Sequence, residues 1–88
     1  MKWTIQYSDE AITFIEKEKI FDEIREEIKK FIQRIRGEQI NIDIKKLKGE
    51  WEGYYRIRKG KIRIILMIDK ENKVVFIDKI DYRGEIYK

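Results

Sequence analysis

Apolar and polar positions alternate at the start of the chain and then repeat every three or four residues. Residues 3–7 (WTIQY) alternate strictly and place three β-favouring side chains on one face, which predicts a first strand. Ser8 and Asp9 follow, and both residue types suit the N-cap of a helix that carries Ile12 and Ile15. The chain therefore begins as a strand followed by a helix.

A second helix is predicted from an apolar stripe that begins after Asp22, a residue type that can cap it. Apolar residues recur at spacings of four, three and four, which is the period of one helix face. Charged side chains occupy the outer face, where Glu26 and Lys30 lie one turn apart. Gly37 suits the position just past the end of this helix. The stripe consists of Ile24, Ile28, Phe31 and Ile35.

Strand patterns return in the second half of the chain. Residues 54–58 and 61–68 flank Lys59 and Gly60, a pair suited to a tight hairpin turn. Residues 74–80 follow a polar turn and form the last predicted strand. These three strands follow one another closely enough to pair as an antiparallel meander.

Residues 38–53 leave two interpretations open. Ile40, Ile42 and Ile44 alternate with polar residues and could form a short edge strand, or they could belong to a loop held against the core. With the loop interpretation the order is β-α-α-β-β-β. This predicts an α+β fold with two N-terminal helices packed on one face of a mainly antiparallel four-stranded sheet. Residues 1–88 are expected to form a single domain.

Two absent residue types exclude several classes of enzyme. The chain has no cysteine, which excludes disulfides, thiolate nucleophiles and thiolate metal sites. It also has no histidine, which excludes zinc hydrolases, Ser-His-Asp enzymes and histidine-based ribonucleases. Any general acid or base must therefore be a carboxylate, a tyrosine, a lysine or an arginine.

Composition also bears on where the protein acts. No apolar run approaches the roughly 20 residues of a membrane-spanning helix, and the N-terminus lacks the pattern of a signal peptide. We therefore expect a cytoplasmic protein without a membrane partner. The chain is rich in Ile, Lys and Glu and lacks proline, which fits either selection at high temperature or genomic base composition.

Positive charge is concentrated in the predicted strands. Residues 1–44 carry 8 basic and 10 acidic side chains, whereas residues 45–88 carry 13 basic and 7 acidic ones. Most of the excess lies between Lys45 and Arg63, where 8 basic side chains accompany only Glu50 and Glu52. Acidic helices and basic strands together predict one face that binds a polyanion.

A hairpin turn at residues 59–60 would cluster cationic side chains on one face of the sheet. Arg58 would then lie opposite Lys61, and Arg56 opposite Arg63. Opposed like charges cost roughly 0.2–1 kcal/mol per pair, which favours a functional reason for the cluster. Arginine forks suit bidentate phosphate contacts; the alternative is a solvated face that serves solubility and protects the sheet edge. The opposite face would pack beneath the helices through Ile57, Ile62 and Ile64.

The C-terminal residues 82–88 add a tyrosine close to basic residues. Arg83 and Tyr87 can be held near the sheet, and Gly84 permits a close approach of the backbone. Nearby positive charge favours the phenolate, so Tyr87 is a candidate base in a chain without histidine. The alternative is a terminal aromatic that covers apolar surface. Trp51 also has two interpretations, a stacking partner for a nucleobase or a cover for the edge of the core.

Four motifs, in this order, resemble the RelE/ParE toxin superfamily. They are LKG at residues 47–49, YRIR at 55–58, GKIRII at 60–65 and RGEIY at 83–87. They are similar to that superfamily's L-x-G, Y-R-I-R, G-x-Y-R-hydrophobic and closing R-x-x-hydrophobic-Y patterns, and the predicted element order matches its fold. No single motif is specific, so the resemblance rests on their order and spacing over nearly the whole chain.

The resemblance implies the toxin of a type II toxin–antitoxin pair. RelE-like members enter the ribosomal A site and cleave mRNA there, the 2′-hydroxyl attacking its own phosphodiester. Arg63 and Arg83 would then neutralise the phosphorane, and Tyr87 would stack on or deprotonate the nucleotide. This implies neither a metal ion nor a cofactor. The residues implied to bind RNA are Lys48, Arg56, Arg58 and Lys61.

The same resemblance implies several partners. They are a RelB-like antitoxin, the ribosome and mRNA, and the expected assembly is a toxin–antitoxin hetero-oligomer. An acidic antitoxin helix beside the basic sheet or near the C-terminus would mask the site. The antitoxin is expected to be encoded next to this gene.

Two positions depart from the pattern and two other functions stay open. Asp81 and Tyr82 stand where many RelE-type enzymes have basic residues or histidine, which reduces the cationic character of the site. One alternative is a ParE-like toxin, which shares the fold but inhibits DNA gyrase by binding. Such members generally lack the cleavage set, so Arg83 with Tyr87 favours the nuclease. The other alternative is a non-catalytic module that binds RNA or the ribosome.

Overall fold

Two helices and a five-stranded sheet form the fold that the computed structural model describes for residues 2–82. The order along the chain is β1 (Thr4–Tyr7), α1 (Asp9–Glu18), α2 (Phe21–Ile35), β2 (Asp43–Lys46), β3 (Tyr54–Lys59), β4 (Ile62–Asp69) and β5 (Val74–Tyr82). A short 3-10 helix, η1 (Gly49–Trp51), lies between β2 and β3. No helix within residues 2–82 is long and apolar enough to cross a membrane.

The strands are arranged in the order β1-β5-β4-β3-β2. β1 runs parallel to β5, and the other three neighbouring pairs are antiparallel. The predicted α+β fold with a mainly antiparallel sheet is confirmed, but the predicted number of four strands is wrong. The fifth strand is β2, the edge strand that residues 38–53 left open. Ile42 and Ile44 are partly buried against the core, so this short segment both packs and pairs.

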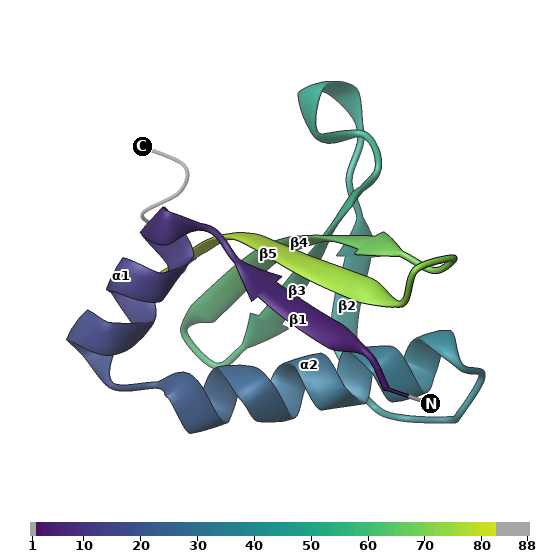
Figure 1. Cartoon of the computed structure of the whole chain (residues 1–88), viewed down its shortest axis with the longest axis horizontal. Helices are drawn as coiled ribbons and strands as arrows, with labels where there is room; N and C mark the ends of the chain where they lie inside the picture. The colour runs from purple at the N-terminus through teal and green to yellow at the C-terminus, as the bar shows by residue number, and fades with distance from the viewer. Residues whose placement is uncertain (1, 83–88) are drawn as a thin grey trace.

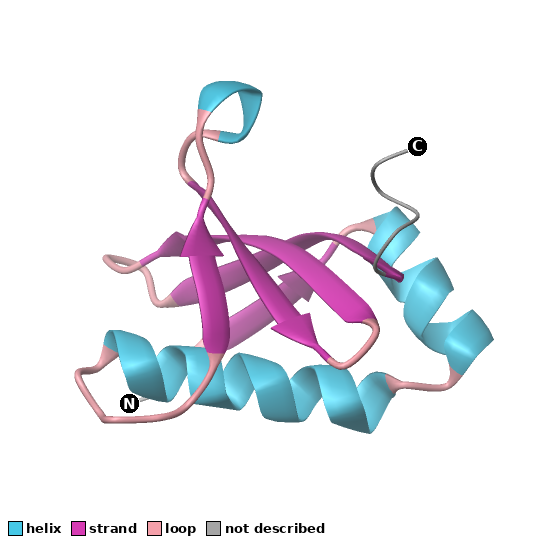
Figure 2. Cartoon of the chain, turned by 180° about the vertical axis from the view of Figure 1, so that it is seen from behind, coloured by secondary structure: helices cyan, strands magenta, loops and turns pink. Residues whose placement is uncertain are grey.

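The core lies between the helices and one face of the sheet. α2 runs beneath the sheet in both views, and α1 packs beside β5 (Figures 1 and 2). The predicted apolar stripe of α2 is confirmed, with Phe31 fully buried and Ile35 partly buried. The sheet meets the helices through buried Ile57, Ile64, Leu66, Val75, Ile77 and Ile80. The opposite face of the sheet is not covered by either helix and is called the open face below.

The ends of α2 follow one sequence prediction and contradict another. The helix starts at Phe21, its N-cap is Ile20, and no side chain caps it, so the predicted capping role of Asp22 is wrong. Asp22 lies in the first turn instead, where its negative charge is favourable beside the free N–H groups. At the other end Gly37 is the predicted residue past the helix, and its N–H donates to the carbonyl of Arg34 at 3.0 Å.

A buried carboxylate ties α2 to the sheet. Glu27 is only 4% exposed, although it belongs to a helix whose outer face is charged. Its Oε2 lies 3.6 Å from Nζ of Lys59 on β3 and 3.4 Å from Nζ of Lys30. A buried carboxylate needs such partners because desolvation penalises the charge. The contact with Lys59 therefore holds the end of β3 over the helix.

Ser8 joins the start of α1 to an irregularity in β5. Its hydroxyl accepts a hydrogen bond from the N–H of Ala11 at 3.0 Å, which confirms the predicted N-cap. The same hydroxyl donates to the carbonyl of Asp78 at 2.6 Å. Asp78 is the extra residue of a β-bulge, because Ile65 pairs with Lys79 while Leu66 pairs with Ile77. One side chain thus satisfies both a helix end and a bulged strand.

We predict that Ser8→Ala lowers the free energy of unfolding by about 1–2 kcal/mol, because it removes the helix cap and leaves the carbonyl of Asp78 without its donor. Urea denaturation followed by circular dichroism measures the change. Ser8→Thr keeps the hydroxyl and is the matched control, expected to retain most of the stability. Equal stability of Ser8→Ala and the wild type would show that the junction contributes nothing.

Candidate functional site

The β3–β4 hairpin places the arginines on the open face, but in a different register from the predicted one. Arg58 pairs with Arg63 and Arg56 pairs with Ile65, so the predicted pairs Arg58–Lys61 and Arg56–Arg63 are wrong. The turn residues are Gly60 and Lys61. Gly60 has a φ of 58°, as expected at the first central position of a type II′ turn.

Turn geometry explains this register, because Gly60 supplies the positive φ that a two-residue type II′ turn needs at its first central position. Lys59 is not a turn residue but the last residue of β3, and its side chain reaches Glu27 beneath the sheet. The residue of β4 that pairs with each arginine of β3 lies two positions later than predicted. Because side chains alternate between the two faces of a strand, a shift of two residues leaves every side chain on its predicted face. The predicted separation is therefore confirmed, with Ile57 and Ile64 buried against the helices and the three arginines on the opposite face.

Carboxylates from the strands on either side offset the opposed arginines. Asp43 on β2 accepts from Nη2 of Arg56 at 3.2 Å and from Nε of Arg58 at 3.0 Å. Asp81 on β5 lies opposite Arg63 in the register of the sheet. The strands of the hairpin itself hold no acidic residue near the arginines, and this compensation arises only when β2 and β5 pair beside them.

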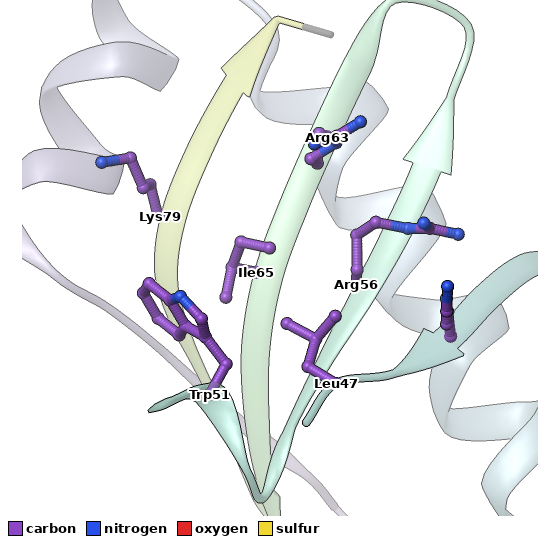
Figure 3. A pocket seen from close by; sticks show the side chains of 7 residues that line it. Leu47, Trp51, Arg56, Arg63, Ile65 and Lys79 are labelled. Atoms are coloured by element: carbon purple, nitrogen blue, oxygen red, sulfur yellow. The ribbon is translucent and has the colours of Figure 1, made fainter. Parts of the chain in front are cut away.

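The open face contains a pocket of about 330 Å³. Four cationic and three apolar side chains line it, namely Lys45, Arg56, Arg63, Lys79, Leu47, Trp51 and Ile65. Figure 3 shows Trp51 and Lys79 on one side, Arg56 on the other, and Ile65 between them. No carboxylate is among the lining residues, which make a cationic pocket with an apolar floor; two of the cations pair with carboxylates outside it, Arg56 with Asp43 and Lys79 with Glu10 at 3.3 Å.

Loop geometry brings the apolar part of this pocket over the sheet. The connection between β2 and β3 rises from the open face, away from α2 (Figure 1). The N–H of Leu47 donates to the carbonyl of Tyr54 at 2.9 Å and closes the base of the loop. Gly53 has a φ of 93°, a conformation that other residues rarely adopt, and it lets the chain return into β3. Trp51 is carried at the tip in η1.

Burial strengthens the electrostatic effect of the two central arginines. Arg56 is 8% exposed and Arg63 is 4% exposed, unusual values for a residue type that prefers water. Within residues 2–82, Nε of Arg56 is buried and has no hydrogen-bond partner. Charges act more strongly on an anion where water is excluded, because the local dielectric is lower. The pocket therefore suits a single anionic group such as a phosphate.

The predicted site residues are brought together only in part. Arg56 and Arg63 line the pocket, and Arg58 lies beside them through the shared carboxylate of Asp43. Lys48 is the exposed N-cap of η1 and Lys61 is exposed in the hairpin turn, so neither lines this pocket. Arg83 and Tyr87 lie outside the described residues, and their predicted roles stay predictions.

Two of the four cationic pocket residues were not predicted. Lys45 on β2 pairs with Arg56 on β3, so its place in the pocket could be recognised only from the pairing of the edge strand. The position of Lys79 in the pocket depends on the bulge at Asp78. Strict alternation from Val75 and Ile77 would point residue 79 toward the helices, whereas the extra residue turns Lys79 to the open face. The signal in the sequence is Ile80, an apolar residue three positions after Ile77 instead of two.

No metal centre is apparent in the described part of the chain. Within residues 2–82, histidine, cysteine, aspartate and glutamate side chains form no group of three that could hold a metal ion. The charged groups that line the pocket are instead guanidinium and ammonium groups.

The fold is similar to those of toxins solved with their antitoxins. A chain of the archaeal RelE–RelB complex from Pyrococcus horikoshii OT3 matches with a TM-score of 0.66 and 22% identity, over 97% of this chain and 99% of that one. A chain of the RelB–RelE complex from Methanococcus jannaschii matches with a TM-score of 0.57 and 28% identity, over 93% and 94%. A chain of the YoeB–YefM complex from Staphylococcus aureus matches with a TM-score of 0.60 and 21% identity, over 94% of this chain and 99% of that one.

These likenesses establish a RelE-like fold across almost the whole chain and agree with the resemblance seen in the motifs. No family model and no curated protein matches the sequence. The fold is therefore recognised through structure, at a sequence identity too low to transfer activity residue by residue.

We predict that Asp43→Asn strengthens binding to polyanions, because it removes the negative charge that neutralises Arg56 and Arg58. Elution from a heparin column is expected at a higher salt concentration than for the wild type. Glu16→Gln changes the net charge equally on the exposed side of α1 and is the matched control. Equal shifts for both variants would mean that Asp43 acts only through net charge.

Proposed function

We propose that this chain, which has the fold of RelE-like toxins, is the toxin of a type II toxin–antitoxin pair and cleaves mRNA in the ribosomal A site. The observation that carries the proposal is the pair of buried arginines, Arg56 and Arg63, in a cationic pocket on the face of the sheet that the helices leave open. Likeness to the toxins of three solved complexes supports the same role.

The proposed reaction is an internal transesterification of RNA. The 2′-oxygen forms a bond to the adjacent phosphorus while the bond from phosphorus to the 5′-oxygen breaks. The products are a 2′,3′-cyclic phosphate and a 5′-hydroxyl. The 2′-hydroxyl loses its proton to a base, and the leaving 5′-oxygen gains one from an acid. No water, metal ion or cofactor takes part in this step.

Cationic side chains supply most of the proposed catalysis. The phosphorane carries more negative charge than the starting phosphodiester, so fixed cations stabilise it more than the ground state. Arg63 and Arg83 are proposed for this role. Tyr87 is the proposed base or stacking residue, because histidine is absent and cations close to a phenol would favour its phenolate. A lysine or arginine of the pocket would protonate the leaving oxygen.

RNA binding is proposed to involve a wider cationic surface. Lys45 and Lys79 line the pocket and are added to the sequence-predicted residues for this role. Exposed lysines outside the pocket contact phosphates farther along the strand or on the ribosome, where bulk charge rather than geometry matters. The predicted RNA-binding residues, besides Arg56 and Arg58, are Lys48 and Lys61.

Two macromolecular partners follow from this proposal. The ribosome presents the mRNA, and the protein is expected to act in the cytoplasm, where translation occurs. A RelB-like antitoxin is expected to neutralise the toxin in a hetero-oligomer, as RelB and YefM accompany the toxins of the solved complexes. An acidic antitoxin segment over the open face would compete with phosphate for the arginines.

Arg63→Ala is expected to reduce cleavage at least about 100-fold, the effect of removing one charge-stabilising donor from a transition state. Primer extension on mRNA in a translating extract measures the cuts in the A site. Lys70→Ala removes an equal charge from an exposed turn and should cut like the wild type. Arg83→Ala and Tyr87→Phe test the proposed C-terminal residues in the same assay, and circular dichroism verifies the fold of each variant.

Other outcomes would replace this proposal. A protein that leaves mRNA intact during translation but inhibits DNA gyrase would be a ParE-like toxin. Salt-sensitive binding to RNA without any cut would indicate a non-catalytic module. The absence of a small acidic protein in the adjacent reading frame would count against the toxin–antitoxin assignment.

A further inference from the structure

We propose that Trp51 is the residue that stacks on a nucleobase, and that it gives the pocket a preference for purines. This inference rests on the proposed function, because it names how the same site holds its RNA. The base would lie against the indole and the apolar floor of the pocket, while its phosphate lies near Arg56 and Arg63.

Trp51 does not serve the core. Its side chain is 40% exposed, and it is not among the partly buried hydrophobic residues that pack against the core. Exposing a large aromatic side chain forgoes the stabilisation that burial would supply. Trp51 nevertheless lines the cationic pocket, carried there by the loop between β2 and β3. A ligand with a flat apolar part would cover it.

Tyr54 holds the indole without covering both of its faces. The two ring centroids are 5.2 Å apart and the planes are 89° apart, an edge-to-face contact. Such a contact uses the face of only one of the two rings, so at least one face of the indole stays uncovered by Tyr54. The η1 backbone adds a hydrogen bond from the N–H of Trp51 to the carbonyl of Lys48 at 3.3 Å. The indole is therefore positioned before a ligand arrives, which lowers the entropic cost of stacking.

The rest of the pocket matches the two halves of a nucleotide. Leu47 and Ile65 form the apolar floor, and Ile65 lies between Trp51 and Arg56 in Figure 3. Arg63 lies two residues before Ile65 on the same face of β4, about 7 Å along the strand. A volume of about 330 Å³ is at the lower end of the range of small-ligand pockets and suits a single nucleotide unit.

The combination of groups favours RNA over an apolar protein segment. Four cations surround the apolar floor and no carboxylate lines the pocket. An inserted apolar side chain of a partner would remove water from the buried guanidinium groups of Arg56 and Arg63 without supplying an anion, which is costly. A nucleotide brings the flat ring and the negative charge together. Purines overlap an indole more extensively than pyrimidines, so their stronger stacking yields a modest purine preference.

The test compares two short probes that differ only in their bases, an oligoadenylate and an abasic oligoribose phosphate of the same length. The wild-type protein is expected to bind the oligoadenylate about tenfold more tightly, the scale of one stacked base. Trp51→Leu should abolish this difference and leave the abasic affinity unchanged, whereas Trp51→Phe should retain part of it. Oligouridylate should bind with an intermediate affinity.

Fluorescence identifies the stacking residue directly. In a Trp3→Phe background Trp51 is the remaining tryptophan, and oligoadenylate should quench its emission while the abasic probe should not. Phe21→Leu alters another exposed aromatic, on α2, and serves as the control that keeps wild-type binding. Equal affinity for the two probes, or an unchanged difference in Trp51→Leu, would overturn the inference.

These outcomes are separable from those of the proposed function. If Trp51→Leu binds oligoadenylate like the wild type while Arg63→Ala still abolishes cleavage, only the stacking role fails. If the wild type cuts no mRNA but shows the Trp51-dependent preference, the nuclease proposal fails and the base-binding pocket stands. A Trp51→Leu variant that instead loses only its antitoxin would assign the indole to the protein interface.

Discussion

Burial of one face of the sheet beneath two helices is the constraint on which the rest of the structure depends. Side chains of a strand alternate between faces, so a chain that commits Ile57, Ile64 and Ile77 to the core must place their neighbours on the open face. Those neighbours include Arg56, Arg58 and Arg63. At the end of β3, the exposed side chain of Lys59 reaches the buried carboxylate of Glu27 and links the hairpin to α2. The alternation that buries these isoleucines therefore also places the arginines on the open face.

Asp43 offsets only part of the positive charge on the open face. Asp43 bridges Arg56 and Arg58 from the edge strand, which lowers the repulsion between opposed arginines. The pocket that Arg56 lines has four cationic side chains and no carboxylate among its lining residues, although Asp43 and Glu10 pair with Arg56 and Lys79 from outside it. Arginines held in this way need little reorganisation when an anion binds, and preorganised charge is the main way in which a protein stabilises a phosphorane. The same feature explains why a stable fold can retain a cluster of like charges.

Two local irregularities make this surface into a pocket. The bulge at Asp78 reverses the alternation of β5 and turns Lys79 to the open face, and Ser8 satisfies the extra carbonyl. The loop that carries Trp51 rises over the same face because its base is closed between Leu47 and Tyr54. Without the bulge the pocket would lose the cation of Lys79. Without the loop it would lose the apolar side chain of Trp51. Charge and aromatic surface meet only because both irregularities occur beside the same strands.

The sequence by itself determined both helices, four of the five strands, the cap at Ser8 and the face on which the arginines lie, because these depend on local periodicity and on neighbours along the chain. Only the tertiary structure decided the fifth strand, the hairpin register and the membership of Lys45 and Lys79 in the pocket. The edge strand and the two lysines depend on contacts between distant segments, β2 against β3 and Ser8 against Asp78, and the register depends on the conformation of Gly60. Periodicity cannot reveal such contacts, because it describes one segment at a time.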